Sequence, residues 1–456
     1  MRVIFSNHST APVNLGGAER SLLKLVDDWA AKNPDFEPFF FTKAPTGLFT
    51  KALDERGWKY RAFRFRGWAL PSPQPAPVAE RTTFAAADYQ AVGAMIDELE
   101  RLKPDLVVTN TLVAPWAAFA AKTLGLPHAW FVREYGDLDH DLKFQEGRRR
   151  TLADIGLLSE AVFTNSLALK NHVASAVDPE KISVVYPSVD AGFVTERAAQ
   201  APASTPFPQS SPGLKITVVG RVEPGKGQFR AIDALGLLKA DGIDASLCLV
   251  GSWKTPGYDL ELRDRATALG VADRVTFAGE QANPYPYVEA ADVCVTPSTV
   301  EAFGRTTLEY LMAGRPVVAS NTGGSAELVE PGVTGSLFDP DSPRELADAL
   351  AVYATTPGLA EAHGHAARAS VERVLGSEFS QEAAITRLEG LVGQPAYKLP
   401  EISRYWFALP GDYASLGATT ARMAAGLLAS RLRTRSGLVG RILRRPGVAT
   451  RRILGR

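Results

Sequence analysis

Two basic residues stand five positions apart in a glycine-containing loop. The segment Val219-Gly-Arg-Val-Glu-Pro-Gly-Lys-Gly227, here called the cationic loop, contains Arg221 and Lys226. It follows an apolar run typical of a buried strand and precedes a helical pattern, so we expect it at the carboxyl end of a strand. The planar guanidinium and the compact ammonium can grip a diphosphate and stabilise charge on a departing nucleoside diphosphate. Two solvated surface cations are the alternative.

Two glutamates, Glu301 and Glu309, frame the start of a predicted helix. Glu301 lies in the loop after the predicted strand 292–296, and Glu309 lies in the first turns of the helix. Carboxylates accept hydrogen bonds from paired sugar hydroxyls, which gives both residues a possible binding role. Thr306-x-x-Glu309 also fits a capping box, in which the glutamate bonds only the backbone. Local chemistry alone favours the capping box for Glu309.

A glycine pair, Gly16 and Gly17, opens the first predicted helix directly after the first predicted strand. Glycines let the backbone approach a ligand, and the free N–H groups of a helix start attract anions. An ordinary tight turn explains the same pattern, and the pair alone does not decide between the two interpretations.

Short apolar runs alternate with amphipathic stretches along most of the chain, which indicates parallel sheets built from βαβ units. A Pro- and Ser-rich stretch at 198–213 interrupts the alternation, and a second series follows it. We therefore predict an α/β fold with two doubly wound Rossmann-like domains facing a cleft. The predicted strands are 3–6, 37–42, 105–109, 129–132, 161–165, 182–186, 214–220, 245–251, 274–278, 292–296, 316–320 and 335–338. The predicted segments are a first domain at 1–197, a linker at 198–213, a second domain at 214–375, a helix returning to the first domain at 376–396, and a tail at 397–456.

Bulk composition narrows the class of protein. The 456 residues carry 50 basic and 50 acidic side chains, which argues against a nucleic-acid binder. No apolar run is long enough to predict a membrane-spanning helix, and the N-terminus lacks the pattern of a signal peptide. The two cysteines, Cys248 and Cys294, lie in apolar runs, which suits buried thiols in a reducing compartment. We expect a cytoplasmic protein.

In their order and spacing, these motifs resemble those of the family 4 glycosyltransferases, which have the two-Rossmann-domain (GT-B) architecture. The similarity runs from about residue 3 to 390 and is strongest at 216–350. The matching elements are Gly16-Gly-Ala-Glu19, Val184-Val-Tyr-Pro-Ser-Val-Asp190, Gly220-Arg221 with Lys226-Gly227, Glu301-x7-Glu309, Ala313-Gly-Arg-Pro-Val-Val-Ala319, Thr322-Gly-Gly-Ser-Ala-Glu327 and Gly332-Val-Thr-Gly-Ser-Leu337.

The resemblance implies a donor site for a nucleotide-sugar, which is a substrate, so no cofactor is expected. Arg221 and Lys226 would hold the diphosphate, and Glu309 the ribose hydroxyls. Glu301 would contact the donor sugar. Further implied donor contacts are Gly16 and Gly17 at the phosphates, the backbone of Phe303, Gly304 and Arg305 at the sugar, and Glu280 and Gln281 at the nucleobase. The resemblance also implies metal-independent transfer with retention of anomeric configuration to a glycan or lipid-linked acceptor, in polysaccharide or glycolipid assembly.

One position departs from the family pattern. Many members have a histidine where this chain has Arg133, followed here by Glu134. We expect Arg133 to contact sugar or phosphate and Glu134 to orient the acceptor, and we interpret His128 as a buried strand residue. The departure keeps open a catalytically weak binder of nucleotide-sugars or glycans. A sugar-nucleotide epimerase of the same architecture is a further alternative, which fits Glu301-x7-Glu309 and the Arg221 and Lys226 pair less well.

Two further segments invite rival interpretations. Asp137-x-Asp139 resembles a metal clamp, but we interpret it as a solvated acidic loop and predict no metal site. Residues 401–456 carry eleven arginines and two acidic residues, interleaved with apolar residues. That pattern favours a helix on the anionic cytoplasmic face of a membrane, and packing on the protein itself is the alternative.

Overall fold

The computed structural model describes residues 1–11, 15–70, 78–187, 189, 191–208, 213–253, 255–376 and 378–400, with only the backbone at 78–84 and 191. The predicted basic tail at 401–456 lies outside the described residues. In the described part of the chain, no helix has the length and apolar character needed to cross a bilayer.

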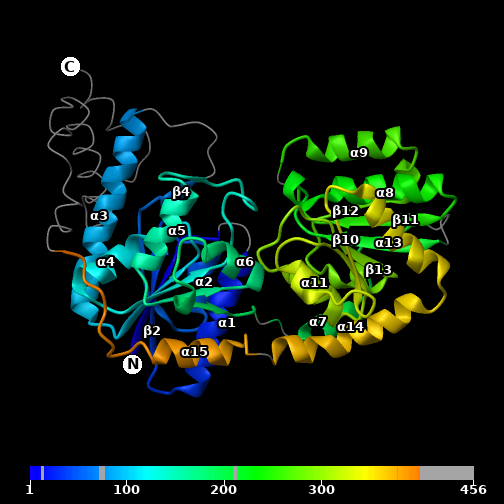
Figure 1. The fold of residues 1–456 in the computed structure, drawn as a ribbon. Helices are drawn as coiled ribbons and strands as arrows, with labels where there is room; N and C mark the ends of the chain where they lie inside the picture. The colour runs from blue at the N-terminus through cyan, green and yellow to red at the C-terminus, as the bar shows by residue number, and fades with distance from the viewer. Residues whose placement is uncertain are drawn as a thin grey trace.

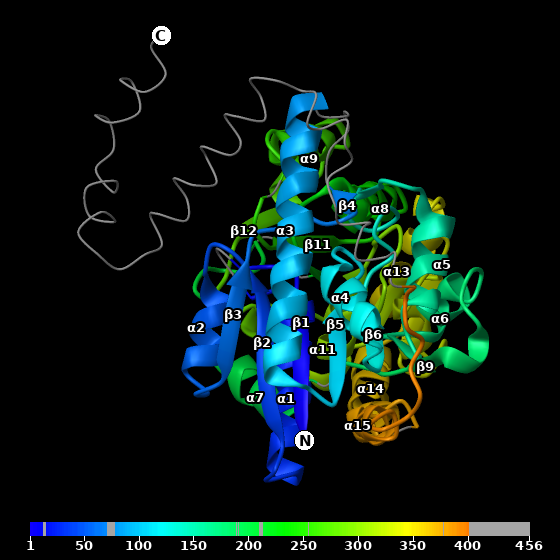
Figure 2. The ribbon, with the colours of Figure 1, turned by 90° about the vertical axis from the view of Figure 1, so that its left-hand side faces the viewer.

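The first domain is built on a seven-stranded parallel sheet in the order β3-β2-β1-β5-β6-β8-β9. Its central strands are apolar and fully buried because helices cover both faces (Figures 1 and 2). α1, α2 and α15 pack on one face, and α3 and α4 on the other. The strands are β1 (Arg2–Asn7), β2 (Glu37–Lys43), β3 (Lys59–Phe63), β5 (Leu106–Asn110), β6 (His128–Val132), β8 (Ala161–Thr164) and β9 (Ile182–Val184). The helices are α1 (Gly17–Lys32), α2 (Leu48–Asp54), α3 (Val78–Leu102), α4 (Trp116–Leu124), α5 (Arg148–Leu157) and α6 (Leu167–Val173).

The second domain repeats this plan with a six-stranded parallel sheet in the order β12-β11-β10-β13-β14-β15. α8, α9 and α13 cover one face, and α7, α10, α11 and α14 cover the other. The strands are β10 (Leu214–Val219), β11 (Ala245–Val250), β12 (Val275–Gly279), β13 (Val293–Thr296), β14 (Val317–Ser320) and β15 (Gly335–Phe338). The helices are α7 (Ala191–Ala198), α8 (Gln228–Ala240), α9 (Tyr258–Ala268), α10 (Tyr285–Glu289), α11 (Arg305–Met312), α12 (Ser325–Leu328), α13 (Pro343–Thr355) and α14 (Leu359–Leu375). The last helix, α15 (Gln381–Glu389), follows them in the chain but packs on the first domain.

The chain crosses between the domains earlier than the sequence predicted. The first domain was expected to reach residue 197, but α7 packs on α10 and α11 of the second domain. The return crossing runs beside the first one, because the Tyr186 amide donates to the Phe379 carbonyl at 2.9 Å. α15 then packs on α1, where the Trp29 indole donates to Glu389 at 2.8 Å (Figure 1). Two chain segments therefore join the domains near Tyr186.

These sheets confirm the predicted fold class of two doubly wound α/β domains. Each of the twelve predicted strands corresponds to a strand of the structure. Three strands were not predicted: β3, and the short antiparallel pair β4 (Ala69–Leu70) and β7 (Lys143–Phe144). β3 reads Lys-Tyr-Arg-Ala-Phe and lies at the sheet edge, where polar residues hide the apolar pattern of a strand.

Candidate active site

The cationic loop begins at the carboxyl end of β10 and is fixed against the loop that follows β13. Gly227 has a φ of +69°, and a Cβ there would lie 1.9 Å from the Pro297 carbonyl oxygen, so only glycine fits this contact. The Thr299 amide donates to the Gly225 carbonyl at 3.0 Å. The loop carrying Lys226 is therefore held against the loop carrying Glu301.

Lys226 and Glu301 form an ion pair across this contact. The Lys226 Nζ lies 2.6 Å from Glu301 Oε1, which also accepts the Ser298 hydroxyl at 2.7 Å. Burial acts to raise the pKa of Glu301, but Lys226 and Ser298 outweigh it, and the net pKa is lowered. Glu301 is therefore an anion at neutral pH. Arg221 pairs with Glu223 at 3.2 Å and remains 41% exposed, open to an anionic ligand.

The backbone around Glu301 is shaped by the following glycine-rich segment. The Gly324 amide donates to the Glu301 carbonyl at 2.7 Å. Gly304 has a φ of +87°, and a Cβ there would meet the Ser325 hydroxyl at 2.2 Å. The two motifs, 301–305 and 322–327, thus form one packed unit at the carboxyl ends of β13 and β14.

Glu309 does not cap its helix, so the capping-box interpretation is wrong. α11 begins at Arg305 with Gly304 as its N-cap and no side-chain cap. Glu309 instead accepts from Arg305 Nε at 3.0 Å, one helical turn earlier. Burial and the neighbouring Glu309 raise the pKa of Tyr285, so this tyrosine stays neutral beside the carboxylate. Glu309 is thus held between Arg305 and Tyr285 in this structure.

A cavity of about 200 Å³ lies where the carboxyl edges of the two sheets meet. Both domains contribute to its wall. From the second domain come Lys226, Glu301, Ala302, Phe303, Gly304 and Arg305, and from the first come Gly17, Ala18, Ser21, Arg133, Glu134, Asp139, His140, Asn165 and Pro187. The structure therefore brings the Lys226–Glu301 pair together with Gly17, Arg133 and Glu134.

Arg133 and Glu134 follow β6 and have different surroundings. Arg133 Nε donates to Asn110 Oδ1 at 2.6 Å, and its guanidinium lies 4.9 Å from the Phe131 ring centre. Burial lowers the pKa of Arg133 to about 10, so it remains a cation. Glu134 accepts the Leu112 amide at 2.8 Å. Burial raises the pKa of Glu134 to about 8, so its carboxyl carries a proton at neutral pH and can donate a hydrogen bond.

His140 is a cavity residue that the sequence analysis did not assign. It stands in the segment 135–142, where Asp139 accepts the Tyr135 and Gly136 amides at 2.9 and 2.8 Å. Asp137 pairs with Arg148 at 2.9 Å. Leu138, His140 and Asp141 are exposed, in keeping with the interpretation as a solvated acidic loop, but Asp137 and Asp139 also fix the shape of the loop. Partial desolvation lowers the pKa of His140, and Arg221 and Lys226 lower it further against Asp139, although the side chain remains exposed at the cavity rim. His140 is therefore a neutral imidazole in the cavity wall.

The remaining predicted residues lie around this centre rather than in the cavity wall. Gly16 precedes α1 beside Gly17, and a Cβ there would lie 2.5 Å from the Glu19 carboxylate. Glu280 and Gln281 follow β12, and the Gln281 amide turns back to the Ala278 carbonyl at 2.6 Å. His128 is fully buried beside Thr109 at 2.8 Å, as interpreted from the sequence.

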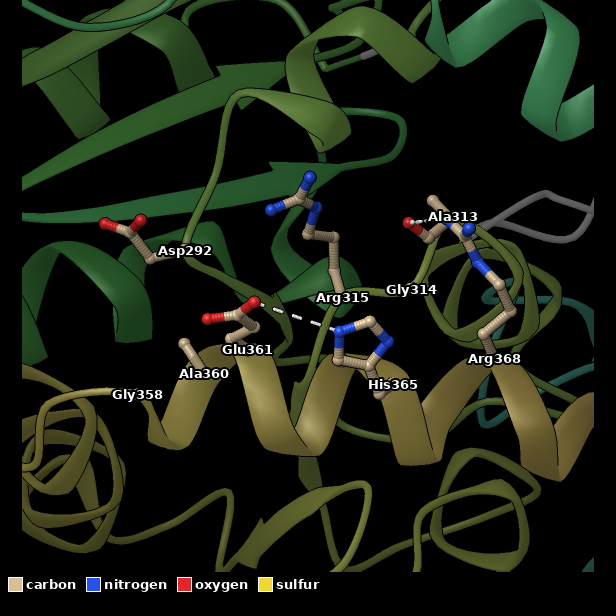
Figure 3. A pocket seen from close by; sticks show the side chains of 10 residues that line it. Asp292, Ala313, Gly314, Arg315, Gly358, Ala360, Glu361, His365 and Arg368 are labelled. Atoms are coloured by element: carbon tan, nitrogen blue, oxygen red, sulfur yellow. Dashed lines mark hydrogen bonds and ion pairs between the residues drawn. The ribbon is translucent and has the colours of Figure 1, made fainter.

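A larger cavity, of about 420 Å³, lies at the opposite end of the second sheet (Figure 3). Its wall comes from segments that precede β13 and β14 and from α14. Two of its basic groups have partners: Arg315 pairs with Glu289 at 2.6 Å, and Arg368 donates to the Ala313 carbonyl at 3.1 Å. Ligands of doubly wound sheets bind at the carboxyl ends of the strands, so we place the active site at the smaller cavity.

Cys248 and Cys294 are buried thiols. Among the described residues, no group of three or more histidine, cysteine or carboxylate side chains is placed to hold a metal ion. Metal-independent chemistry stays a prediction.

Comparison with known proteins gives family matches over both domains. Residues 15–193 match the family model described as "Glycosyltransferase Family 4", and residues 206–370 match "Glycosyl transferases group 1". A D-inositol 3-phosphate glycosyltransferase of Actinosynnema mirum is 35% identical over 198 residues, which are 41% of this chain and 46% of that protein. The lipopolysaccharide core biosynthesis mannosyltransferase LpsB of Rhizobium meliloti is 34% identical over 138 residues, 29% of this chain and 39% of that protein.

The chain thus spans less than half the length of these two relatives. A solved structure of Anabaena HepE in complex with UDP aligns with a TM-score of 0.66 and 23% identity, covering 86% of this chain and 99% of that one. This likeness shows a shared two-domain fold.

Proposed function

Because its two halves match these two models, the chain belongs to the family 4 glycosyltransferases of GT-B architecture, and we propose that it transfers a sugar from a nucleotide-sugar to an acceptor hydroxyl. The observation that carries the proposal is the Lys226–Glu301 pair, 2.6 Å apart, in a cavity whose other wall presents Glu134 and His140. Lys226, which can bind a diphosphate, and Glu301, which can bind a sugar, thus lie across one small cavity from Glu134 and His140, which can bind an acceptor hydroxyl.

In the proposed reaction, the bond between the anomeric carbon and the diphosphate breaks, and negative charge develops on the leaving diphosphate. Arg221 and Lys226 stabilise that charge. Lys226 is engaged by Glu301 in this structure, so a donor must displace this contact, leaving Glu301 to accept a sugar hydroxyl. Glu309, on the adjoining helix α11, accepts hydrogen bonds from the ribose hydroxyls. Retention of configuration and independence from metal belong to this proposal as expectations from the family.

The acceptor side contains two neutral polar groups. Protonated Glu134 donates a hydrogen bond, and neutral His140 both donates and accepts. They can orient an acceptor hydroxyl while its proton passes to an oxygen of the leaving diphosphate. Such orientation lowers the activation barrier because the entropy lost in aligning the reacting atoms is already paid on binding.

Nucleotide binding tests the donor half of the proposal. UDP is the first candidate, since the similar Anabaena protein was solved with UDP, and GDP and dTDP complete the panel. A ligand that binds only the folded protein raises its melting temperature. We expect one nucleoside diphosphate to stabilise the wild type, and Lys226→Met to weaken that binding by about 10- to 100-fold, since it removes a charge-assisted contact of roughly 1.5–3 kcal/mol.

Lys239→Met is the matched control, because Lys239 lies in the last turn of α8 and bonds the Gly270 carbonyl. Stabilisation by no member of the panel, or equal affinity in Lys226→Met and wild type, contradicts the donor site.

A further inference from the structure

Glu327 on α12 forms a contact between the two domains, close to the proposed site of sugar transfer. Its two carboxylate oxygens accept the backbone amides of Leu167 and Ala168, at 2.9 and 2.5 Å. These amides begin α6, which lies on the side of the first domain that faces the second (Figure 1). The Tyr186 hydroxyl, at the domain crossover, donates to the same carboxylate at 3.1 Å. One side chain of the second domain thus binds three donors outside its own sheet.

The carboxylate suits the backbone groups that it binds. The first amides of a helix have no acceptor within the helix itself. The Ser166 hydroxyl caps α6 by accepting the Leu169 amide at 2.9 Å, and Glu327 accepts the two amides between them. A charged acceptor forms a stronger hydrogen bond to an amide than a neutral one, and the helix dipole adds to this attraction. A shorter or uncharged side chain at position 327 would hold α6 more weakly.

On the second domain, Glu327 belongs to the packed unit that also contains Glu301. Gly323 has a φ of +65°, and a Cβ there would lie 2.2 Å from the Glu301 carbonyl oxygen. The Thr307 hydroxyl of α11 donates to the Ser325 hydroxyl of α12 at 3.1 Å. Because these contacts leave no free space between the two segments, a shift of α12 also shifts the backbone of Glu301.

The residues on either side of Glu301 also contact the first domain. Ala302 is buried in an apolar cluster of the first domain that includes Tyr135 and side chains of α6, and Val300 packs against this cluster. Burial and the neighbouring Glu327 raise the pKa of Tyr135 to about 12, so its hydroxyl is neutral. The Glu327 contact and the apolar contact therefore hold the second domain against the same part of the first, around α6.

α6 is connected in turn to the wall of the cavity on the first domain. Asn165 directly precedes the cap of α6 and lines the cavity. Its side-chain amide donates to the carbonyl of Arg133, another wall residue, at 2.8 Å. Glu327 thus joins the segment of Glu301, in one wall of the cavity, to the segment of Asn165 in the other.

We propose that Glu327 is a positioning residue that sets the separation of the two cavity walls, so that groups of the first domain reach the sugar held at Lys226 and Glu301. The inference rests on the proposed function, because it takes the cavity as the place of that sugar. The proposed side-chain contacts to the nucleotide, from Arg221, Lys226 and Glu309, lie on the second domain. Loss of the Glu327 contact should therefore lower the rate of reaction while the nucleotide still binds.

Nucleotide binding and turnover of the full chain, measured on the same samples, test the proposal. The binding probes are UDP, GDP and dTDP, and the turnover probes are UDP-glucose, GDP-mannose and dTDP-glucose, followed by release of nucleoside diphosphate. The binding stoichiometry counts the folded sites, and kcat is expressed per site. A variant that is merely less stable has fewer sites but an unchanged kcat per site.

The variants remove the contact in steps. Glu327→Ala removes the acceptor of all three donors, Glu327→Gln keeps one oxygen in a side chain of the same shape, and Tyr186→Phe removes only one donor. Glu330→Ala is the control, because the Glu330 carboxylate pairs at 2.7 Å with Arg373 of its own domain.

We expect Glu327→Ala to lower kcat per site by at least about tenfold, since small displacements of reacting groups cost rate steeply. Its affinity for the nucleoside diphosphate should stay within about threefold of the wild type. Glu327→Gln and Tyr186→Phe should lower kcat less than Glu327→Ala, and Glu330→Ala should leave it unchanged.

Two results overturn the inference and leave the proposed function standing. One is an equal kcat per site in Glu327→Ala and wild type. The other is a loss of nucleotide affinity as large as the loss of kcat, which would mean that Glu327 only supports the donor loops. A wild type that binds no nucleotide and releases none contradicts the proposed function and this inference together.

Discussion

Replacement of Glu134 by glutamine should stabilise the protein, and the gain should grow with pH. The folded protein holds this carboxyl in protonated form up to a pKa of about 8, whereas the ordinary value is 4.5. Between these values, unfolding releases the proton, so the free energy of unfolding falls as pH rises. pH 7 lies about 2.5 units above the ordinary pKa of 4.5, and at 1.36 kcal/mol per unit this lowers the free energy of unfolding by roughly 3 kcal/mol relative to pH 4.5.

Glutamine removes this term because it has no proton to lose, and its oxygen can still accept the Leu112 amide. Glu134→Gln should therefore gain about 3 kcal/mol at pH 7 and almost nothing at pH 4.5, while its transfer rate falls if the carboxyl orients the acceptor. Urea unfolding of wild type and variant at pH 4.5, 6, 7 and 8.5 measures the gain.

Glu146→Gln is the control, because Glu146 is 67% exposed and only 3.7 Å from Arg150 in a surface pair. It should change stability little at any of these pH values. A gain in Glu134→Gln that is the same at pH 4.5 and 8.5, or a loss of stability at pH 7, refutes the assignment of a buried neutral carboxyl.

Three further predictions concern the cleft, the hinge and the tail. His140→Gln should lower kcat/KM for transfer by about tenfold or more, while its nucleotide affinity stays within about twofold of the wild type. His365→Gln is the control, because His365 is 82% exposed, and unchanged transfer in His140→Gln would remove His140 from the site. Glu327→Ala should enlarge the radius of gyration in solution scattering, because Glu327 on α12 accepts hydrogen bonds across the domains from the Leu167 amide at 2.9 Å and the Tyr186 hydroxyl at 3.1 Å. Glu330→Ala is the control, since its partner Arg373 lies in the same domain, and equal radii in Glu327→Ala and wild type would contradict a role of Glu327 in holding the domains together. Truncation after Pro400 should release the protein from anionic vesicles, since basic residues near such a surface contribute about 1 kcal/mol each; equal binding with and without 401–456 rejects the membrane role.

The sequence predicted the strands with continuous apolar runs because parallel strands buried on both faces leave that pattern. β5 and β6 are examples, and every residue of each is buried. β3 was not predicted because it is an edge strand with polar residues, such as Lys59 and Arg61, which interrupt the apolar pattern. The position of the domain crossover near Tyr186 was not predicted either. The Pro-rich stretch at 198–213 looks like a linker in the sequence, whereas the crossover is fixed by tertiary contacts that leave no local pattern.

The motifs of the proposed donor side could be recognised in the sequence because each one is local in the chain. The acceptor side could not, because it depends on which loops the fold brings together. His140 lay in an acidic segment whose carboxylates turned out to bind backbone amides and Arg148.

Release of nucleoside diphosphate from nucleotide-sugars tests the central claim most directly. Wild type, Lys226→Met and Lys239→Met are incubated with UDP-, GDP- and dTDP-linked sugars, with and without a phosphorylated polyol, and the released nucleotide is measured. The proposed function predicts release from one donor class, unchanged in Lys239→Met and lowered about 100-fold in Lys226→Met, since one charge-stabilising group is removed. No release from any donor, or an equal rate in Lys226→Met, contradicts it.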